Sequence, residues 1–162
     1  MTFIVDGTNG LTFPNSTVQA SAGSVLQVVQ GTYTSSVSTT STSFVTTNLT
    51  ASITPKFSTS KILIFVSLAN IYISAAAVNE CFTVYRNSTN ISPAGTGVLT
   101  GFGLARNEAG AFQGNMSFSY LDSPATTSST AYTAYFASFQ GNSVSINLNG
   151  TASTIILMEI AA

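Results

Sequence analysis

Hydrophobic and polar positions along this chain follow strand-sized runs, and no segment keeps the 3.6-residue apolar period of an amphipathic helix. The runs are rich in β-branched, aromatic and hydroxyl residues, and breaks containing Gly or Asn separate them. This pattern predicts an all-β fold, an antiparallel β-sandwich of jelly-roll type. The strands expected after the opening segment are Val25–Tyr33, Thr42–Thr47, Leu49–Thr54, Lys61–Ser74, Val78–Arg86, Gly97–Ala105, Phe112–Leu121, Ala131–Phe139, Ser143–Leu148 and Thr154–Ile160.

Two of these runs are apolar on both faces, although a strand at a protein surface normally has one face in water. In Lys61–Ile73 one face carries Ile62, Ile64, Val66, Leu68, Asn70 and Tyr72, and the other carries Leu63, Phe65, Ser67, Ala69, Ile71 and Ile73. In Ala131–Phe139 the faces are Tyr132, Ala134 and Phe136, and Tyr135, Ala137 and Phe139. An apolar outer face indicates either a second subunit or a cover of the chain's own loops. We expect a subunit interface that includes Tyr132, Tyr135, Phe136 and Phe139.

The first 23 residues form a separate region in this interpretation, and residues 24–162 form the sandwich domain. Apolar residues flank Gly7 and Gly10, which predicts two short strands around a turn, and small polar residues at 16–24 indicate a linker. Each apolar side chain contributes roughly 1.5–3 kcal/mol when it is fully buried, so the arm needs a partner. It either attaches the protein to a larger structure or folds back as an edge hairpin of its own domain. The expected attachment residues are Phe3, Ile4, Val5, Leu11 and Phe13.

Charged side chains are scarce in this 162-residue chain. Four basic and five acidic residues make up 6% of the sequence, whereas 44% is hydrophobic. Ser and Thr number 48, so hydroxyl and amide groups must supply most of the polar surface. This composition suits a surface committed to fixed neighbours, as in a homo-oligomer or a shell, and it also suits secreted β-proteins. A net charge of −1 leaves no basic surface for nucleic acid.

The residues that most enzyme chemistry needs are missing or scattered. The absence of His and the presence of a single Cys exclude thiolate–imidazole zinc sites and most catalytic triads. The five carboxylates form no close pair and no Asp-rich calcium loop, and the glycines at 95, 97, 101 and 103 do not open a helix. We therefore expect no enzyme activity, no cofactor and no metal, and we expect Cys81 to be a small buried hydrophobe.

One segment, Ile62–Val78, is apolar enough to be considered as a membrane span. It reaches only the lower length limit for a spanning helix and is rich in strand-forming residues, so it predicts a strand and no membrane insertion. The opening lacks the basic region and long apolar stretch of a signal peptide, which argues against secretion by the usual route.

The opening Gly7-Thr8-Asn9-Gly10-Leu11-Thr12-Phe13-Pro14-Asn15-Ser16-Thr17-Val18-Gln19 resembles a segment common in bacteriophage tail fibres and appendages. That segment has the form Gly-Leu/Ile-x-Phe-Pro-Asp-Gly-Thr-x-Gln, and here Asn15 and Ser16 replace the Asp and Gly. The stretches Val28–Tyr33, Leu49–Pro55 and Ser60–Ile64 are similar to phage virion β-sandwich domains. Together these motifs span residues 7–64, about a third of the chain. The resemblance implies a trimeric β-sandwich exposed on the virion, and it brings no catalytic residues.

The resemblance leaves two places on the virion open. No heptads or sustained repeats form the shaft that a tail fibre needs, which favours a trimeric capsid decoration (cement) protein bound to the major capsid protein or another virion protein. The alternative is a tail fibre or tailspike-like tip that binds a host receptor. A cellular binding module such as a lectin is a third possibility. In the phage interpretations the protein is made in the host cytoplasm, lies on the outer surface of the virion, and can contact host-surface glycans.

Overall fold

The computed structural model describes residues 4–6, 10–12, 18–19, 25–74, 78–92, 101–107 and 110–161. Within these residues the regular structure is β-strand, apart from one 3-10 helix, η1 (Leu148–Gly150). The prediction of an all-β fold is therefore confirmed. The strands are β1 (Ile4–Asp6), β2 (Gly10–Thr12), β3 (Val18–Gln19), β4 (Val25–Tyr33), β5 (Val37–Thr39), β6 (Val45–Ile53), β7 (Lys61–Ile73), β8 (Val78–Arg86), β9 (Thr89–Asn90), β10 (Gly103–Asn107), β11 (Phe112–Asp122), β12 (Thr130–Ser138), β13 (Val144–Ile146) and β14 (Ser153–Ile160).

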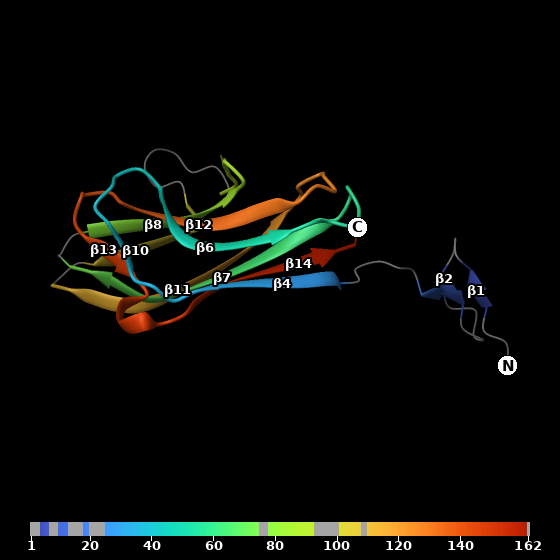
Figure 1. The fold of residues 1–162 in the computed structure, drawn as a ribbon, viewed down its shortest axis with the longest axis horizontal. Coiled ribbons are helices and arrows are strands. Elements are labelled where there is room, and N and C mark those ends of the chain that lie inside the picture. Colours follow the sequence, from blue (N-terminus) through green and yellow to red (C-terminus); the bar gives the residue numbers. More distant parts are fainter. Residues whose placement is uncertain are drawn as a thin grey trace.

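Two antiparallel sheets lie face to face as the two layers of a sandwich (Figure 1). The first, which we call the β7 sheet, has the main strands β4-β14-β7-β11, with the short strands β13 and β5 beside one end of β7. The second, the β12 sheet, has the order β10-β8-β12-β6, and β9 pairs with β8. Along the chain the eight main strands alternate between the two sheets, except that β8 and β10 are neighbours in the β12 sheet.

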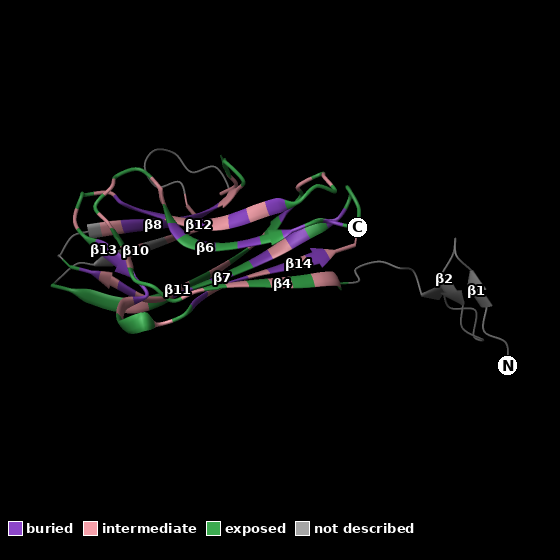
Figure 2. Cartoon of the chain, viewed as in Figure 1, coloured by how far each residue is buried: buried purple, intermediate pink, exposed green. Residues whose placement is uncertain are grey.

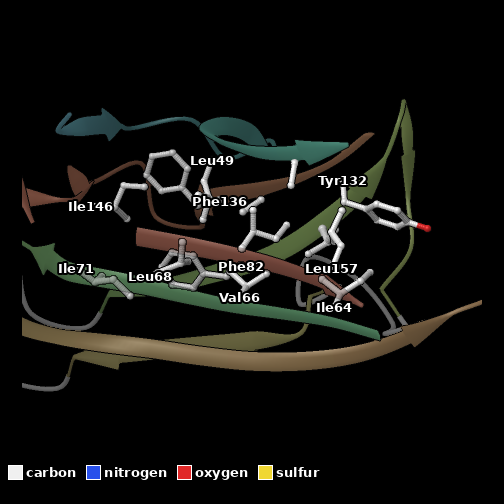
Figure 3. Close-up of a cluster of buried hydrophobic side chains, with 14 of the residues drawn as sticks. Leu49, Ile64, Val66, Leu68, Ile71, Phe82, Tyr132, Phe136, Ile146 and Leu157 are labelled. Carbon is white, nitrogen blue, oxygen red and sulfur yellow. The ribbon is translucent and has the colours of Figure 1, made fainter. Parts of the chain in front are cut away.

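The core lies between the inner faces of the two sheets. Successive side chains of a strand point to opposite faces, so buried and more exposed residues alternate along β6, β7 and β14 (Figure 2). Figure 3 shows the inward side chains of β7 and β14 packed against those of β8 and β12. The buried cluster consists of Leu49, Ala51, Ile53, Ile62, Ile64, Val66, Leu68, Ile71, Phe82, Val84, Tyr132, Ala134, Phe136, Val144, Ile146, Ile155 and Leu157.

A bulge in β7 explains part of the apolar pattern on both faces of this strand. Asn70 has a φ of 48°, in the left-handed region that Asn tolerates, and the pairing with β11 shifts register beside it. Before the bulge the inward face ends at Leu68, and after it Ile71 and Ile73 point inward and are buried. The prediction that Ile71 and Ile73 share one face of the strand with Phe65 is therefore wrong.

A second bulge joins two predicted strands into one. Thr42–Thr47 and Leu49–Thr54 were expected as separate strands, but β6 runs through both as Val45–Ile53. The change of register occurs around Asn48, whose φ is 64°. The Thr47 hydroxyl donates a hydrogen bond of 2.7 Å to the carbonyl oxygen of Ala134 in β12, so the bulged residue still bonds to the neighbouring strand.

Strands of different sheets approach each other closely along both edges of the sandwich. A Cβ atom on Gly31 of β4 would lie 2.1 Å from the carbonyl oxygen of Thr50 in β6, so only glycine fits at this position. At the other edge, a Cβ atom on Gly103 of β10 would lie 2.5 Å from the sulfur of Met116 in β11. The two sheets therefore meet at β4 and β6 on one side and at β10 and β11 on the other.

The N-terminal strands form a third antiparallel sheet of order β1-β2-β3, and none of them pairs with a described strand of the sandwich. Figure 1 shows β1 and β2 beyond the start of β4. The predicted pair of short strands corresponds to β1 and β2. The third strand, Val18–Gln19, lies within the stretch predicted as a linker, so strand pairing extends further along the chain than we expected.

Candidate functional site

The outer face of the β7 sheet carries four of the six exposed large hydrophobic side chains among the described residues. These four are Val25, Val28, Phe65 and Leu121, whose exposed fractions lie between 42% and 56%. Single exposed apolar residues are common on soluble proteins, but a contiguous group marks an interaction site. The sequence drew attention to Phe65 through the two-faced pattern of its strand, but it did not show that Val28 and Leu121 lie on the same face.

Cross-strand register places Val28, Phe65 and Leu121 in rows that run across the sheet from β11 through β7 and β14 to β4, and it places Val25 in an outer row with Ile160 and Lys61. The first row is Leu121, Leu63, Met158 and Val28. The second row is Ser119, Phe65, Ile156 and Gln30, and the third is Ser117, Ser67, Thr154 and Thr32. We call these three rows the apolar sheet face after their six apolar positions; the other six positions carry hydroxyl or amide side chains. None of the twelve positions is charged, so another protein can cover this face without burying an unpaired charge.

A hollow of about 410 Å³ opens on the apolar sheet face beside Phe65. Hydroxyl side chains form much of its wall. Its lining residues are Phe65, Val66, Ser67, Ser117, Phe118, Ser119, Thr154 and Ile156, and we call it the Phe65 hollow. The hydroxyl groups of Ser117 and Ser67 are hydrogen bonded to each other at 3.2 Å, so they do not need a ligand. Because the Phe65 ring stands 42% exposed at its rim, a protruding group and a recess lie next to each other on one face.

The β12 sheet carries a smaller aromatic cluster of Phe44, Tyr85 and Tyr135. The rings of Tyr85 and Tyr135 stack with their centroids 4.1 Å apart, and Phe44 meets Tyr85 edge-on at 6.4 Å. Burial raises the pKa of Tyr85, and its neighbour Tyr135 adds to the effect. Beside the rings, the hydroxyl groups of Thr50 and Thr133 are hydrogen bonded at 2.9 Å. The cluster is thus a half-buried, uncharged surface of aromatic rings and hydroxyl groups.

The structure separates the four residues expected at a subunit interface. Tyr135 lies in β12 and Phe139 follows that strand, so neither belongs to the apolar sheet face of the β7 sheet. Both are half-buried, and a subunit contact through them remains a prediction. Tyr132 and Phe136 are fully buried in the core of a single chain (Figure 3), so the prediction that they contact another subunit is wrong. The period of two correctly separated the faces of β12, but it does not say which face points inward. The inward face of this strand is the one that carries Tyr132 and Phe136.

Tyr132 takes part in a polar network at the end of the core. Its hydroxyl group donates a hydrogen bond of 2.7 Å to the Asp122 carboxylate, which also forms an ion pair of 2.9 Å with Arg86. Burial raises the pKa of Tyr132, and the hydrogen bond to Asp122 raises it further. The network joins β11, β12 and β8 and leaves no open reactive group, so its geometry indicates a structural role.

Glu80 is the most unusual acidic side chain in the described part of the chain. It is fully buried in β8, both carboxyl oxygens lack a hydrogen-bond partner, and burial raises its pKa to about 8. The Ser138 hydroxyl group, at the paired position of β12, is also buried without a partner. Glu80 is therefore mostly neutral at pH 7. Neither residue opens onto the apolar sheet face or its hollow.

Glu159 shows the opposite behaviour although it too is buried. Burial by itself would raise its pKa, but hydrogen bonds lower it. The side chain of Gln27 donates to one carboxylate oxygen at 2.6 Å, and the backbone N–H of Lys56 donates to the other at 2.7 Å. These bonds tie the end of β14 to β4 and to the turn between β6 and β7, so Glu159 has a structural role.

The attachment residues expected in the N-terminal arm are only partly described. Ile4 and Val5 lie in β1, and Leu11 lies in β2 at the position paired with Val5. Phe3 and Phe13 lie outside the described residues. Attachment through these five side chains remains a prediction.

The described residues show no cluster of three or more His, Cys, Asp or Glu side chains that would ligate a metal ion. Cys81 is free and buried, as expected, and burial raises the pKa of its thiol. In the part of the chain that the structure describes, no helix has the length and apolar character needed to cross a bilayer. No protein-family model matches the chain, and a search of curated proteins found no match.

Proposed function

We propose that this chain is a bacteriophage virion structural protein, a trimeric capsid decoration protein of jelly-roll fold on the outer surface of the head. In this proposal it binds the major capsid protein or another virion protein and reinforces the shell. It has no catalytic role. Its N-terminal arm attaches it to the particle, and the sandwich domain faces outward.

The strand order is the observation that carries the proposal. With the eight main strands lettered A to H along the chain, the β7 sheet has the order A-H-C-F and the β12 sheet has the order B-G-D-E. Eight strands in two antiparallel sheets with this alternation are typical of a jelly roll, a fold used by viral capsid and lectin domains. Both this strand order and the resemblance of the opening segment to phage appendages support a virion structural protein.

The separate N-terminal sheet supports the proposed mode of attachment. Because β1, β2 and β3 pair only among themselves within the described residues, the sandwich keeps its strand order without them. In the proposal, Ile4, Val5 and Leu11 of this sheet are among the residues that contact the virion. Three arms in a trimer would bind with an effective concentration that makes weak single contacts tight.

Add-back to stripped particles tests the proposal. Virions of the phage that encodes the chain are depleted of this protein and then incubated with purified full-length protein or with a variant that lacks residues 1–23. We expect the full-length trimer to rebind to heads and the truncated trimer, folded according to circular dichroism, to stay in solution. Rebinding of the truncated protein would refute attachment through the arm. A full-length protein that binds no part of the head would refute the decoration role.

The second candidate function is that of a tail appendage tip that binds host glycans. The aromatic cluster of Phe44, Tyr85 and Tyr135 favours it, because aromatic rings beside hydroxyl groups on an uncharged surface are suited to neutral sugars. Substituting Tyr85 by Ala would abolish glycan binding by the isolated protein if this candidate is right. Reproducible glycan binding together with localisation on tails would favour it over the decoration role.

A further inference from the structure

We propose that the Phe65 ring of one copy of this chain inserts into the Phe65 hollow of a neighbouring copy. This contact deepens the proposed function, because it assigns the subunit interface of the trimer to the apolar sheet face. This inference depends on the proposed function for one point only, which is that the oligomer is a trimer.

The protruding half of the contact is Phe65 itself. Its ring is 42% exposed on a strand in the middle of the sheet, between Ser119 of β11 and Ile156 of β14. The small Ser119 side chain leaves one side of the ring uncovered. A large aromatic side chain that is exposed at the centre of a sheet, beside a small neighbour, is typical of an anchor residue at an interface.

The receiving half is the hollow next to this ring. Its volume of about 410 Å³ leaves ample room for a phenyl ring, since an apolar cavity of roughly 150 Å³ holds benzene. The hydroxyl groups of Ser67 and Ser117 already bond to each other, so an apolar ring placed over them breaks no hydrogen bond that they make with the protein. Among the other lining residues, Ile156 pairs with Phe65 on the same outer face, whereas Val66 and Phe118 belong to the inward faces of their strands.

A second copy is the occupant that this arrangement favours. Phe65 lines the rim of its own hollow, so where three such faces meet around a threefold axis, each ring can enter the hollow of the next copy and each hollow can receive the ring of the previous one. The three rows carry no charge, so two such faces meet without like-charge repulsion or an unpaired buried charge. The row of Leu121, Leu63, Met158 and Val28 lies beside the ring and would extend the same contact.

The first experiment measures the mass of the full-length protein and two variants by light scattering. Phe65→Asp puts a charge at the proposed contact, and Phe57→Asp is the matched control, because Phe57 is 56% exposed and lies in the turn before β7. We expect Phe65→Asp to raise the dissociation constant by about a hundredfold or more and Phe57→Asp to leave the mass unchanged. Circular dichroism checks that both variants fold. An unchanged oligomer in a folded Phe65→Asp variant would overturn the proposal.

The second experiment tests the direction of the contact with a thiol-specific cross-linker about 10 Å long, because packed sheet faces lie about 10 Å apart and a disulfide would need Cα atoms within about 7 Å. Differently tagged Phe65→Cys and Ser117→Cys copies are co-expressed and treated at a concentration at which light scattering shows that they still form oligomers. Wild type is the control for Cys81, and Ser52→Cys, exposed in β6, replaces Ser117→Cys as the control for chance collisions. We expect the Phe65–Ser117 cross-link to exceed the Ser52 control by about tenfold or more.

The outcomes separate this contact from the proposed function. An oligomeric wild type with cross-linking no greater than the Ser52 control would place the interface elsewhere and overturn this contact, while the trimer would stand. A monomeric wild type would refute both. A monomeric wild type can also be tested for a cover formed by its own N-terminal arm. If Phe65→Cys reacts with a thiol reagent only after residues 1–23 are deleted, this arm covers the apolar sheet face in place of a second copy.

Discussion

At alkaline pH the Glu80→Gln variant should have a larger free energy of unfolding than wild type, and the burial of Glu80 indicates the size of the difference. In the folded protein the Glu80 carboxyl group is buried without a hydrogen-bond partner, and its pKa is about 8 against an ordinary value of 4.5. The folded state therefore holds a proton that the unfolded state releases. The contribution of this proton to stability is fully present below pH 4.5, falls as the pH rises from 4.5 towards 8, and is lost at higher pH.

The gap between the two pKa values corresponds to a loss of roughly 5 kcal/mol across this range, at about 1.4 kcal/mol for each pKa unit. The amide of the Glu80→Gln variant does not ionise, so the stability of this variant should vary little with pH. The new amide N–H groups need acceptors, and the unpartnered Ser138 hydroxyl oxygen lies at the paired position of β12. We therefore expect Glu80→Gln to be less stable than wild type by about 1 kcal/mol at pH 5, because one amide donor stays unpaired. At pH 9 it should be more stable than wild type by several kcal/mol.

Urea denaturation at pH 5, 7 and 9, at a fixed protein concentration, measures the effect through the free energy of unfolding. Glu159→Gln is a matched control, for which we expect the opposite dependence of stability on pH. The hydrogen bonds of Glu159 lower its pKa, so the carboxylate contributes stability above pH 4.5 that is lost as the pH falls through the folded pKa. Glu159→Gln should therefore destabilise the protein at pH 7. If Glu80→Gln has the same dependence on pH as wild type between pH 5 and 9, the reasoning about Glu80 is refuted.

Three further substitutions test the packing, and urea denaturation measures each. Gly31→Ala should destabilise the sandwich by a few kcal/mol, because the new Cβ atom would overlap the Thr50 carbonyl oxygen; an unchanged stability would show that the two sheets do not meet there. Phe136→Ala should cost about 3–5 kcal/mol, since the ring is fully buried, and a cost below about 1 kcal/mol would contradict its place in the core. Tyr132→Phe should cost about 1–3 kcal/mol through loss of the hydrogen bond to Asp122, and a neutral effect would contradict that bond.

The lengths and positions of most strands could be predicted because each depends on local residue types. β4 and β8 occupy the ranges expected from the sequence, Val25–Tyr33 and Val78–Arg86, and β7 ends one residue earlier than expected. The bulges could not be predicted in the same way. Asn48 and Asn70 adopt positive φ angles, and Asn tolerates this conformation without requiring it, so the sequence alone does not show where a strand changes face.

The candidate interface was only partly accessible from the sequence. The two-faced pattern drew attention to β7, and Phe65 lies on its exposed side. The rows that join Phe65 to Leu121 and Val28 depend on pairings between strands far apart in the chain, which a residue pattern does not specify. The period of two also does not show which face of β12 points inward, so the sequence pointed to Tyr132 and Phe136, whose side chains lie in the core.

The number of copies of this chain in each purified virion tests the central claim most directly. Quantitative mass spectrometry against the major capsid protein gives that number, and separate analysis of heads and tails gives the location. A trimeric decoration protein on the head should be present in hundreds of copies, all on heads. A few tens of copies or fewer, found on tails, or no copies in the particle, would contradict the claim.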